Sequence, residues 1–127
     1  MNVVDSSAWL EYFAGGPNAG EFAKAIEEPA RLVVPSITVI EVFKKFVQQR
    51  TETDALMVVG VMQQGTVVDL TGALALAAAT LSIEHKLTLA DAVIYATAKA
   101  HHAVLWTQDA HFKGLPGVEY RKHRGRP

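Results

Sequence analysis

The sequence contains no cysteine, carries almost no net charge and lacks an apolar run long enough to span a membrane. The absence of cysteine excludes disulfide bonds and zinc sites built from thiolates. The formal net charge of −1 is not typical of a nucleic-acid binder, although the distribution of charge matters more than its sum. The longest apolar segment, residues 70–83, is shorter than the roughly 20 residues that a membrane helix needs and is predicted to be a buried helix.

The N-terminus lacks the features of a secretory signal peptide. Asp5 and Glu11 interrupt the first apolar stretch, and no basic segment precedes it. Half of the 127 residues are apolar, which is enough for one domain with one hydrophobic core. We therefore expect a cytoplasmic protein with a domain over residues 1–120 and a basic, flexible tail over residues 121–127.

The spacing of apolar residues predicts short strands that alternate with helices. This alternation predicts an α/β fold with a mainly parallel sheet that is covered by helices on both faces. The expected strands are residues 2–5, 31–34, 66–70, 103–106 and 118–120. The expected helices are residues 6–14, 18–28, 36–50, 52–64, 72–86 and 89–102.

Acidic residues lie at the ends of predicted strands and near the starts of predicted helices. Asp5, Asp69 and Asp109 lie at or just after strand ends, where α/β sheets collect their ligands. Glu41 and Asp91 lie near the starts of two helices. If the sheet is doubly wound, the four acids other than Asp69 can converge on one edge of it.

Each of these four acids also has a purely structural interpretation. Asp5 and Asp109 each precede a helix or turn that they can cap. Glu41 and Asp91 each follow a threonine by three residues, which is the spacing of a capping box. Helix caps are commoner than catalytic acids, so each acid taken alone favours the structural interpretation.

The acids taken together favour a metal site. Glu41 and Asp91 lie at the front of largely apolar helices with few basic residues nearby. A partly buried acid there must be paired or bind a cation, or its pKa rises. Four converging carboxylates repel one another, and Mg²⁺ or Mn²⁺ relieves the repulsion because both ions take oxygen ligands.

The four acids lie in four short segments whose order and spacing are distinctive. The segments are VVDSSAW (residues 3–9), ITVIEV (37–42), LADAVIYATA (89–98) and LWTQDAHF (105–112). In order, spacing and chain length they resemble PIN-domain proteins, and in particular the VapC toxins of bacterial and archaeal toxin–antitoxin pairs. The resemblance extends from residue 3 to about residue 120.

The resemblance implies a PIN-like three-layer sandwich that cleaves RNA endonucleolytically with the help of Mg²⁺ or Mn²⁺. It also implies a homodimer and a small DNA-binding antitoxin of the VapB kind, which inhibits the nuclease. In such an enzyme a metal-activated water hydrolyses the phosphodiester bond. The acidic quartet of catalytic residues and metal ligands corresponds to Asp5, Glu41, Asp91 and Asp109. The supporting polar residues correspond to Ser7 and Thr107.

Side chains around the acids suggest how RNA and the antitoxin bind. Exposed aromatic residues of helices 6–14 and 36–50 would suit an antitoxin helix. No histidine is needed as a base when a metal activates water, and we expect His111 to be a surface or turn residue. Basic residues that could bind phosphates, or equally form a solvated surface, are Lys44, Lys45, Lys113, Arg121, Lys122, Arg124 and Arg126.

Three other functions remain open. The first is a PIN-type nuclease in RNA processing or DNA flap cleavage without an antitoxin, which the neighbouring gene would distinguish. The second is a phospho-receiver-like signalling module, but such a module has an acid pair after the first strand and a lysine after the last core strand, where this sequence has Asp5 alone and no lysine. The third is an inert PIN fold whose acids are only caps, which metal binding would distinguish.

Overall fold

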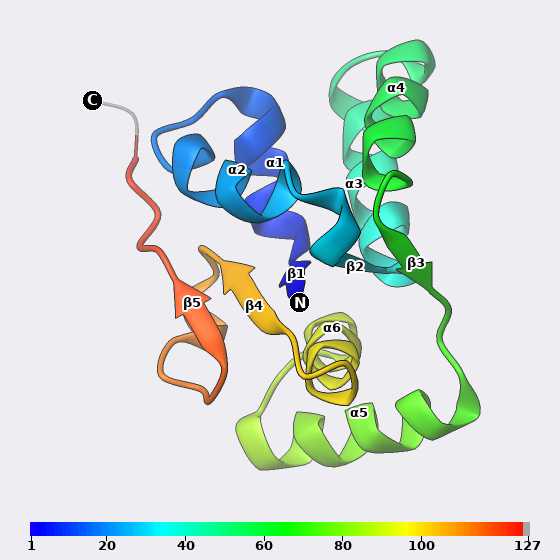
Figure 1. The fold of residues 1–127 in the computed structure, drawn as a ribbon, viewed down its shortest axis with the longest axis vertical. Helices are drawn as coiled ribbons and strands as arrows, with labels where there is room; N and C mark the ends of the chain where they lie inside the picture. The colour runs from blue at the N-terminus through cyan, green and yellow to red at the C-terminus, as the bar shows by residue number, and fades with distance from the viewer. Residues whose placement is uncertain (126–127) are drawn as a thin grey trace.

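A five-stranded parallel sheet between two layers of helices forms the fold of residues 1–125, the part of the chain that the computed structural model describes (Figure 1). The strand order is β3-β2-β1-β4-β5, and every neighbouring pair is parallel. The strands are β1 (Asn2–Val4), β2 (Leu32–Pro35), β3 (Thr66–Val68), β4 (Val104–Thr107) and β5 (Val118–Tyr120). This architecture confirms the predicted α/β sandwich with a central parallel sheet.

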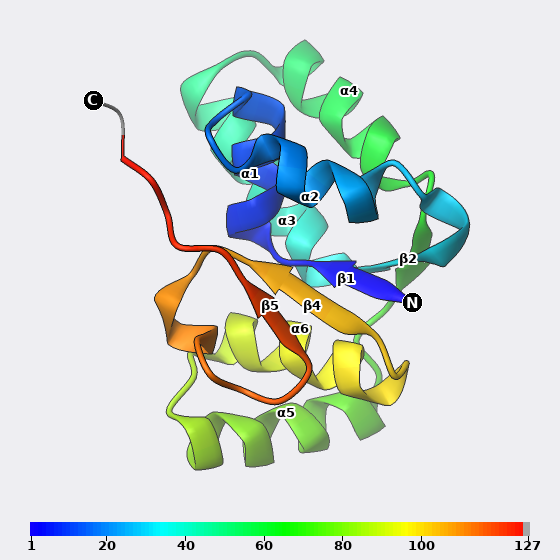
Figure 2. The same cartoon turned by 60° about the vertical axis from the view of Figure 1, so that its left-hand side comes forward.

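Helices cover both faces of the sheet. The α-helices are α1 (Ser6–Ala14), α2 (Ala19–Ile26), α3 (Ser36–Gln49), α4 (Glu52–Met62), α5 (Gly72–His85) and α6 (Leu89–Ala100). Two short 3₁₀ turns, η1 (Pro29–Arg31) and η2 (Ala110–Phe112), precede β2 and follow β4. Figures 1 and 2 show α5 and α6 on one face of the sheet, with α1, α2, α3 and α4 on the other.

The alternation of side chains along the strands divides the core into two clusters. Val3 and Val33 pack with α5 and α6, whereas Val4 and Val34 pack with the helices of the opposite face. All four valines are buried, because a parallel sheet covered on both faces leaves no side open to water. The central strands therefore form a rigid base for the residues at their ends.

The predicted elements are all present, with ends that differ by two residues or fewer. Four α-helices begin at side chains of the types that favour N-caps. Asp5, Thr51, Thr71 and Thr88 each accept a hydrogen bond from the backbone N–H three residues later. The expectation that the segment 70–83 is a buried helix was wrong. It forms α5, which packs through a narrow face and leaves Leu76 and Ile83 largely exposed.

The segment after β5 lies against the start of α2. Asn18 Nδ2 donates a hydrogen bond to the backbone oxygen of Lys122 at 3.0 Å, and Arg124 Nε donates to Asn18 Oδ1 at 3.2 Å. Arg126 lies outside the described residues, and the flexibility of the tail stays a prediction. In the described part of the chain no helix has both the length and the apolar character needed to cross a bilayer.

Candidate metal centre

Asp5 lies directly after β1, buried under the start of α1. Its Oδ1 accepts hydrogen bonds from Ser7 Oγ at 2.7 Å and from the backbone N–H of Ala8 at 2.9 Å. Its Oδ2 accepts a hydrogen bond from Thr107 Oγ1 at 2.5 Å. Burial raises the pKa of Asp5 to about 7, because removal from water outweighs these three hydrogen bonds. The helix-cap interpretation of Asp5 is therefore correct, but a cap alone does not require such deep burial.

Asp91 and Asp109 face each other across the space between α6 and η2. Asp91 lies in the first turn of α6, and Asp109 follows β4 and caps η2 by accepting the backbone N–H of His111 at 2.9 Å. Burial, followed by the negative charge of Asp109, raises the pKa of Asp91. In the absence of a cation, burial and the charge of Asp109 therefore disfavour the ionisation of Asp91.

Glu41 belongs to the same group of acids. The negative charge of Glu41 contributes to the raised pKa of Asp91, and Ser6 Oγ donates a hydrogen bond to Glu41 Oε1 at 2.6 Å. The capping-box interpretation of Glu41 is wrong, since Thr38 lies inside α3 and its hydroxyl donates to Pro35 O at 2.7 Å. Within the described residues, Glu41 thus has no role in starting its helix.

The fold brings these four acids together at the C-terminal edge of the sheet. In Figure 2 the C-terminal ends of β1 and β4, the start of α6 and η2 lie at the same end of the molecule. Asp69 does not join them, because it follows the edge strand β3, two strands away from β1, and is exposed. The strand order therefore separates Asp69 from Asp5 and Asp109, although in the sequence all three follow a strand.

Ser7 and Thr107 connect the acids. Thr107 is buried, and its hydroxyl both donates to Asp5 and accepts the backbone N–H of Asp109 at 2.9 Å. Ser7 Oγ lies 3.5 Å from Thr107 Oγ1 and accepts the backbone N–H of Gln108 at 3.3 Å. The two hydroxyl groups therefore orient Asp5 and fix the segment that carries Asp109.

Sequence reasoning missed two contacts of this centre. The contact of Ser6 with Glu41 was not expected, because Ser6 and Ser7 are adjacent and nothing in the pattern tells which acid each one meets. His111 is exposed in a turn, as expected, but its Nδ1 lies 3.0 Å from Asp109 Oδ1 and 4.0 Å from Asp91 Oδ2. In the sequence, the position of His111 two residues after Asp109 could have indicated this contact.

The donor set fits a hard divalent cation. Within residues 1–125 none of the four acids forms an ion pair with lysine or arginine. One atom each from Asp91, Asp109 and His111 lie within 4.8 Å of one another. Carboxylate oxygens are the ligands that Mg²⁺ and Mn²⁺ prefer, and a cation would offset the burial and the repulsion that raise the pKa of Asp91.

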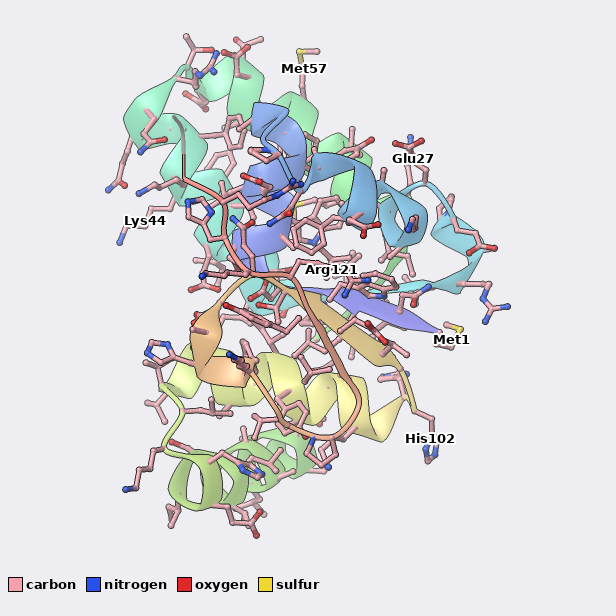
Figure 3. All side chains as sticks on the ribbon, turned by 90° about the vertical axis from the view of Figure 1, so that its left-hand side faces the viewer. Met1, Glu27, Lys44, Met57, His102 and Arg121 are labelled. Carbon is pink, nitrogen blue, oxygen red and sulfur yellow. The ribbon has the colours of Figure 1, made fainter. Side chains whose placement is uncertain are left out.

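The basic residues expected near the centre differ in their surroundings. Lys44 and Lys45 are exposed on α3, and Figure 3 shows Lys44 pointing into solvent. Lys113 is also exposed, with Nζ 6.0 Å from the ring centroid of Tyr120. Arg121, by contrast, forms ion pairs with Glu21 and Glu119. The lysines are therefore more available for phosphates than Arg121 is.

Solved structures of toxins have the same fold. The chain is similar to a toxin–antitoxin complex from Klebsiella pneumoniae, with a TM-score of 0.79, 26% identity, and coverage of 94% of this chain and 96% of that one. It is similar to the sarcin–ricin loop cleaving toxin VapC20 of Mycobacterium tuberculosis, with a TM-score of 0.75, 15% identity, and coverage of 91% and 95%. DNA-bound VapBC from Salmonella typhimurium gives a TM-score of 0.72, 18% identity, and coverage of 95% and 98%.

The sequence itself matches a known domain family. No curated protein matches the chain. The PIN domain, however, matches residues 3–118, which include the four acids and all five strands except the first residue of β1 and the last two residues of β5. The chain belongs to the PIN-domain family.

Proposed function

We propose that this protein is a metal-dependent endoribonuclease and the toxin of a toxin–antitoxin pair. The observation that carries the proposal is the convergence of Asp5, Glu41, Asp91 and Asp109, without a lysine or arginine partner among the described residues, in a PIN-domain chain. Its similarity to toxins of known structure supports the biological role. We expect this protein in the cytoplasm, because a toxin that cleaves RNA and binds an antitoxin meets both there.

The acids would bind one or two divalent ions. Asp5, Asp91 and Asp109 would be ligands, and Glu41 would be a ligand or would orient a water molecule. Bound Mg²⁺ or Mn²⁺ supplies an activated water and neutralises charge at the scissile phosphate. The hydroxyls of Ser7 and Thr107 hold the Asp5 carboxylate in place, so the site needs little rearrangement before it binds the ion.

RNA would approach the acids past the exposed lysines. Lys44 and Lys45 lie on α3, the helix that carries Glu41, and Lys113 directly follows η2. Positive charge near an acidic centre offsets the repulsion between the carboxylates and the phosphate backbone. We propose these three residues as phosphate contacts, with Arg121 contributing less because its ion pairs already hold it.

A groove between α1, α3 and α4, with aromatic side chains at its base and polar residues including Arg50 and Asp54 around them, would bind the antitoxin. Phe13 and Phe46 meet edge to face at its base, with ring centroids 5.9 Å apart, and Met57 on its rim is largely exposed. Such a groove suits the apolar face of an amphipathic helix, and Arg50 on its rim could pair with an acidic residue of that helix. The toxin–antitoxin complexes among the similar structures support a protein partner of this kind.

A second copy of this chain would cover α5. The groove between α5 and α6 encloses about 650 Å³ and is lined mainly by alanine and leucine, with Leu76 and Ile83 exposed beside it. Glu84 and Lys99 also line this groove. In a two-fold dimer the same surface meets itself, so Glu84 of one copy could face Lys99 of the other. We propose this surface as the homodimer interface.

A PIN-type nuclease without an antitoxin, in RNA processing or DNA flap cleavage, would use the same acids. A short adjacent gene with a DNA-binding pattern would favour the toxin. The inert alternative predicts that the acids bind no metal.

RNA cleavage by the purified protein tests the nuclease directly. Reactions with Mg²⁺, Mn²⁺ or EDTA are compared with the same reactions of the Asp91→Asn variant. We expect metal-dependent cleavage that is lost in the variant. Cleavage in EDTA, or an equally active Asp91→Asn protein, would refute the proposed mechanism. A folded protein that binds neither ion would support the inert alternative.

A further inference from the structure

The His111 side chain lies beside two carboxylates of the proposed centre, those of Asp91 and Asp109, although it is 69% exposed. Two contacts to Asp109 Oδ1 hold the residue there: the backbone N–H donates at 2.9 Å, and Nδ1 of the ring lies at 3.0 Å. The same Nδ1 lies 4.0 Å from Asp91 Oδ2. The short turn η2 therefore aims one ring nitrogen at the space between the two acids.

These separations are short enough for one ion to contact all the atoms. With bonds of about 2.1 Å, two ligand atoms of the same ion lie no more than about 4 Å apart. The distances from Nδ1 to Asp109 and to Asp91 are 3.0 Å and 4.0 Å. An ion between these atoms would thus be reached by all three residues with small side-chain movements.

We infer that His111 Nδ1 is an additional ligand of the metal and that this nitrogen makes the centre prefer Mn²⁺ to Mg²⁺. The inference rests on the proposed metal-dependent function and names which ion it uses. Imidazole nitrogen binds first-row transition ions, whereas Mg²⁺ prefers oxygen ligands and retains its waters. To bind a metal, Nδ1 must carry no proton, so the neutral ring holds its proton on Nε2.

A purely positioning role for His111 makes a different prediction. In that case Nδ1–H donates a hydrogen bond to Asp109 and never contacts the ion. Glutamine at this position keeps a side-chain N–H for that hydrogen bond but has no imidazole nitrogen. The variant His111→Gln therefore separates ligation from positioning.

Electron paramagnetic resonance of the full chain with Mn²⁺ alone tests the inference. Pulsed measurements detect the hyperfine coupling of ¹⁴N directly bound to Mn²⁺, and titration gives the affinities for Mn²⁺ and Mg²⁺. The proteins compared are the wild type, His111→Gln, Asp91→Asn and a matched control, His101→Gln. His101 is exposed at the far end of α6, about 15 Å from Asp91 by the rise of the helix.

We expect nitrogen coupling in the wild type and in His101→Gln, and none in His111→Gln. Loss of this ligand should weaken Mn²⁺ binding by about tenfold or more, since even residues that only orient ligands contribute that much, and should change Mg²⁺ binding far less. If Mn²⁺ binds through Asp91 without nitrogen coupling, the role of His111 is refuted and the metal centre stands. If the wild type binds no Mn²⁺, both the inference and the proposed metal-dependent function fail.

Discussion

Thr107 Oγ1 donates a hydrogen bond to Asp5 Oδ2 at 2.5 Å, joining residues that lie 102 positions apart in the sequence. The bond connects the C-terminal ends of β1 and β4, which are neighbours in the sheet. The same hydroxyl accepts the backbone N–H of Asp109. One side chain thereby orients two of the four acids, and its removal should affect both.

Replacing Thr107 by valine keeps the shape of the side chain and removes these hydrogen bonds. The Thr107 hydroxyl lowers the pKa of Asp5, so its loss should raise that pKa further and weaken Mn²⁺ binding by about tenfold. The free energy of unfolding should fall by about 1 kcal/mol, because the partly buried backbone N–H of Asp109 is left without this partner. Metal titration and urea unfolding measure the two effects.

The matched control is Thr97→Val, in which a buried threonine of α6 loses a hydrogen bond to Val93 O and no contact with the acids. It should lower stability without changing metal affinity. Equal metal affinity in Thr107→Val and the wild type would contradict the role assigned to Thr107.

The buried carboxyl of Asp5 should make the metal-free protein less stable as the pH rises. Its pKa is 3.8 in an ordinary environment and about 7 in the fold. Between these values the folded protein keeps a proton that the unfolded chain releases, so the stability from Asp5 is full below about pH 4 and is lost as the pH approaches 7. The free energy of unfolding changes by at most about 1.4 kcal/mol for each pH unit.

Urea unfolding in EDTA between pH 4.5 and 8 measures this effect as the difference between the wild type and Asp5→Asn. The variant, neutral at every pH, should abolish cleavage, keep the fold and become the more stable protein at high pH. A difference that does not change with pH would show that Asp5 ionises normally.

Mg²⁺ or Mn²⁺ should stabilise the folded protein, because the folded state binds the ion and the unfolded chain does not. At a concentration one hundred times the dissociation constant, the gain is about 2.7 kcal/mol. Asp91→Asn should lose most of this gain. The control Asp69→Asn removes an exposed acid at the end of β3 and should keep the full stabilisation by the ion. Differential scanning calorimetry with and without the ion gives the shift in Tm, and equal shifts in the two variants would exclude the proposed ligand.

The lysines of α3 should contribute to RNA binding through phosphates. Replacing both Lys44 and Lys45 by glutamine should weaken binding of single-stranded RNA and reduce the slope of log K against log salt by about 1.4. Fluorescence anisotropy in EDTA measures binding without cleavage. The control is Arg31→Gln, an exposed residue just before β2 and so at the opposite edge of the sheet. A similar loss in the control would point to nonspecific charge effects.

The exposed face of α5 should hold two copies together. Ile83→Asp places a charge in the proposed interface, while Glu52→Ala changes an exposed residue on α4. We expect a dimer for the wild type and for Glu52→Ala, and a monomer for Ile83→Asp. Light scattering coupled to size-exclusion chromatography gives the masses. A dimeric Ile83→Asp protein would place the interface elsewhere.

The order of helices and strands could be predicted from the sequence because local patterns specify it. The spacing of apolar residues indicates the elements, and cap residues such as Asp5 and Thr88 indicate where helices begin. The burial of α5 could not be predicted, because an alanine-rich helix looks the same whether it packs inside a domain or lies on its surface. Composition gives the apolar character of a helix but not the identity of its neighbours.

The candidate centre was predicted only in part for a similar reason. Asp5, Asp69 and Asp109 all follow strands, and only the strand order separates Asp69 from the other two. The contacts of Ser6 with Glu41 and of His111 with Asp91 depend on side-chain directions across elements distant in the sequence. Such directions are set by tertiary packing.

The central place of β1 between β2 and β4 has a consequence for protein synthesis. The strand β1, which Asp5 directly follows, is the first to leave the ribosome, but its partner β4 is made about a hundred residues later. Long-range parallel pairing of this kind forms slowly and requires almost the whole chain. The nascent chain would therefore lack an assembled acidic centre until translation is nearly complete. Under the proposed function, this delay allows time for an antitoxin already present to meet the chain as it folds.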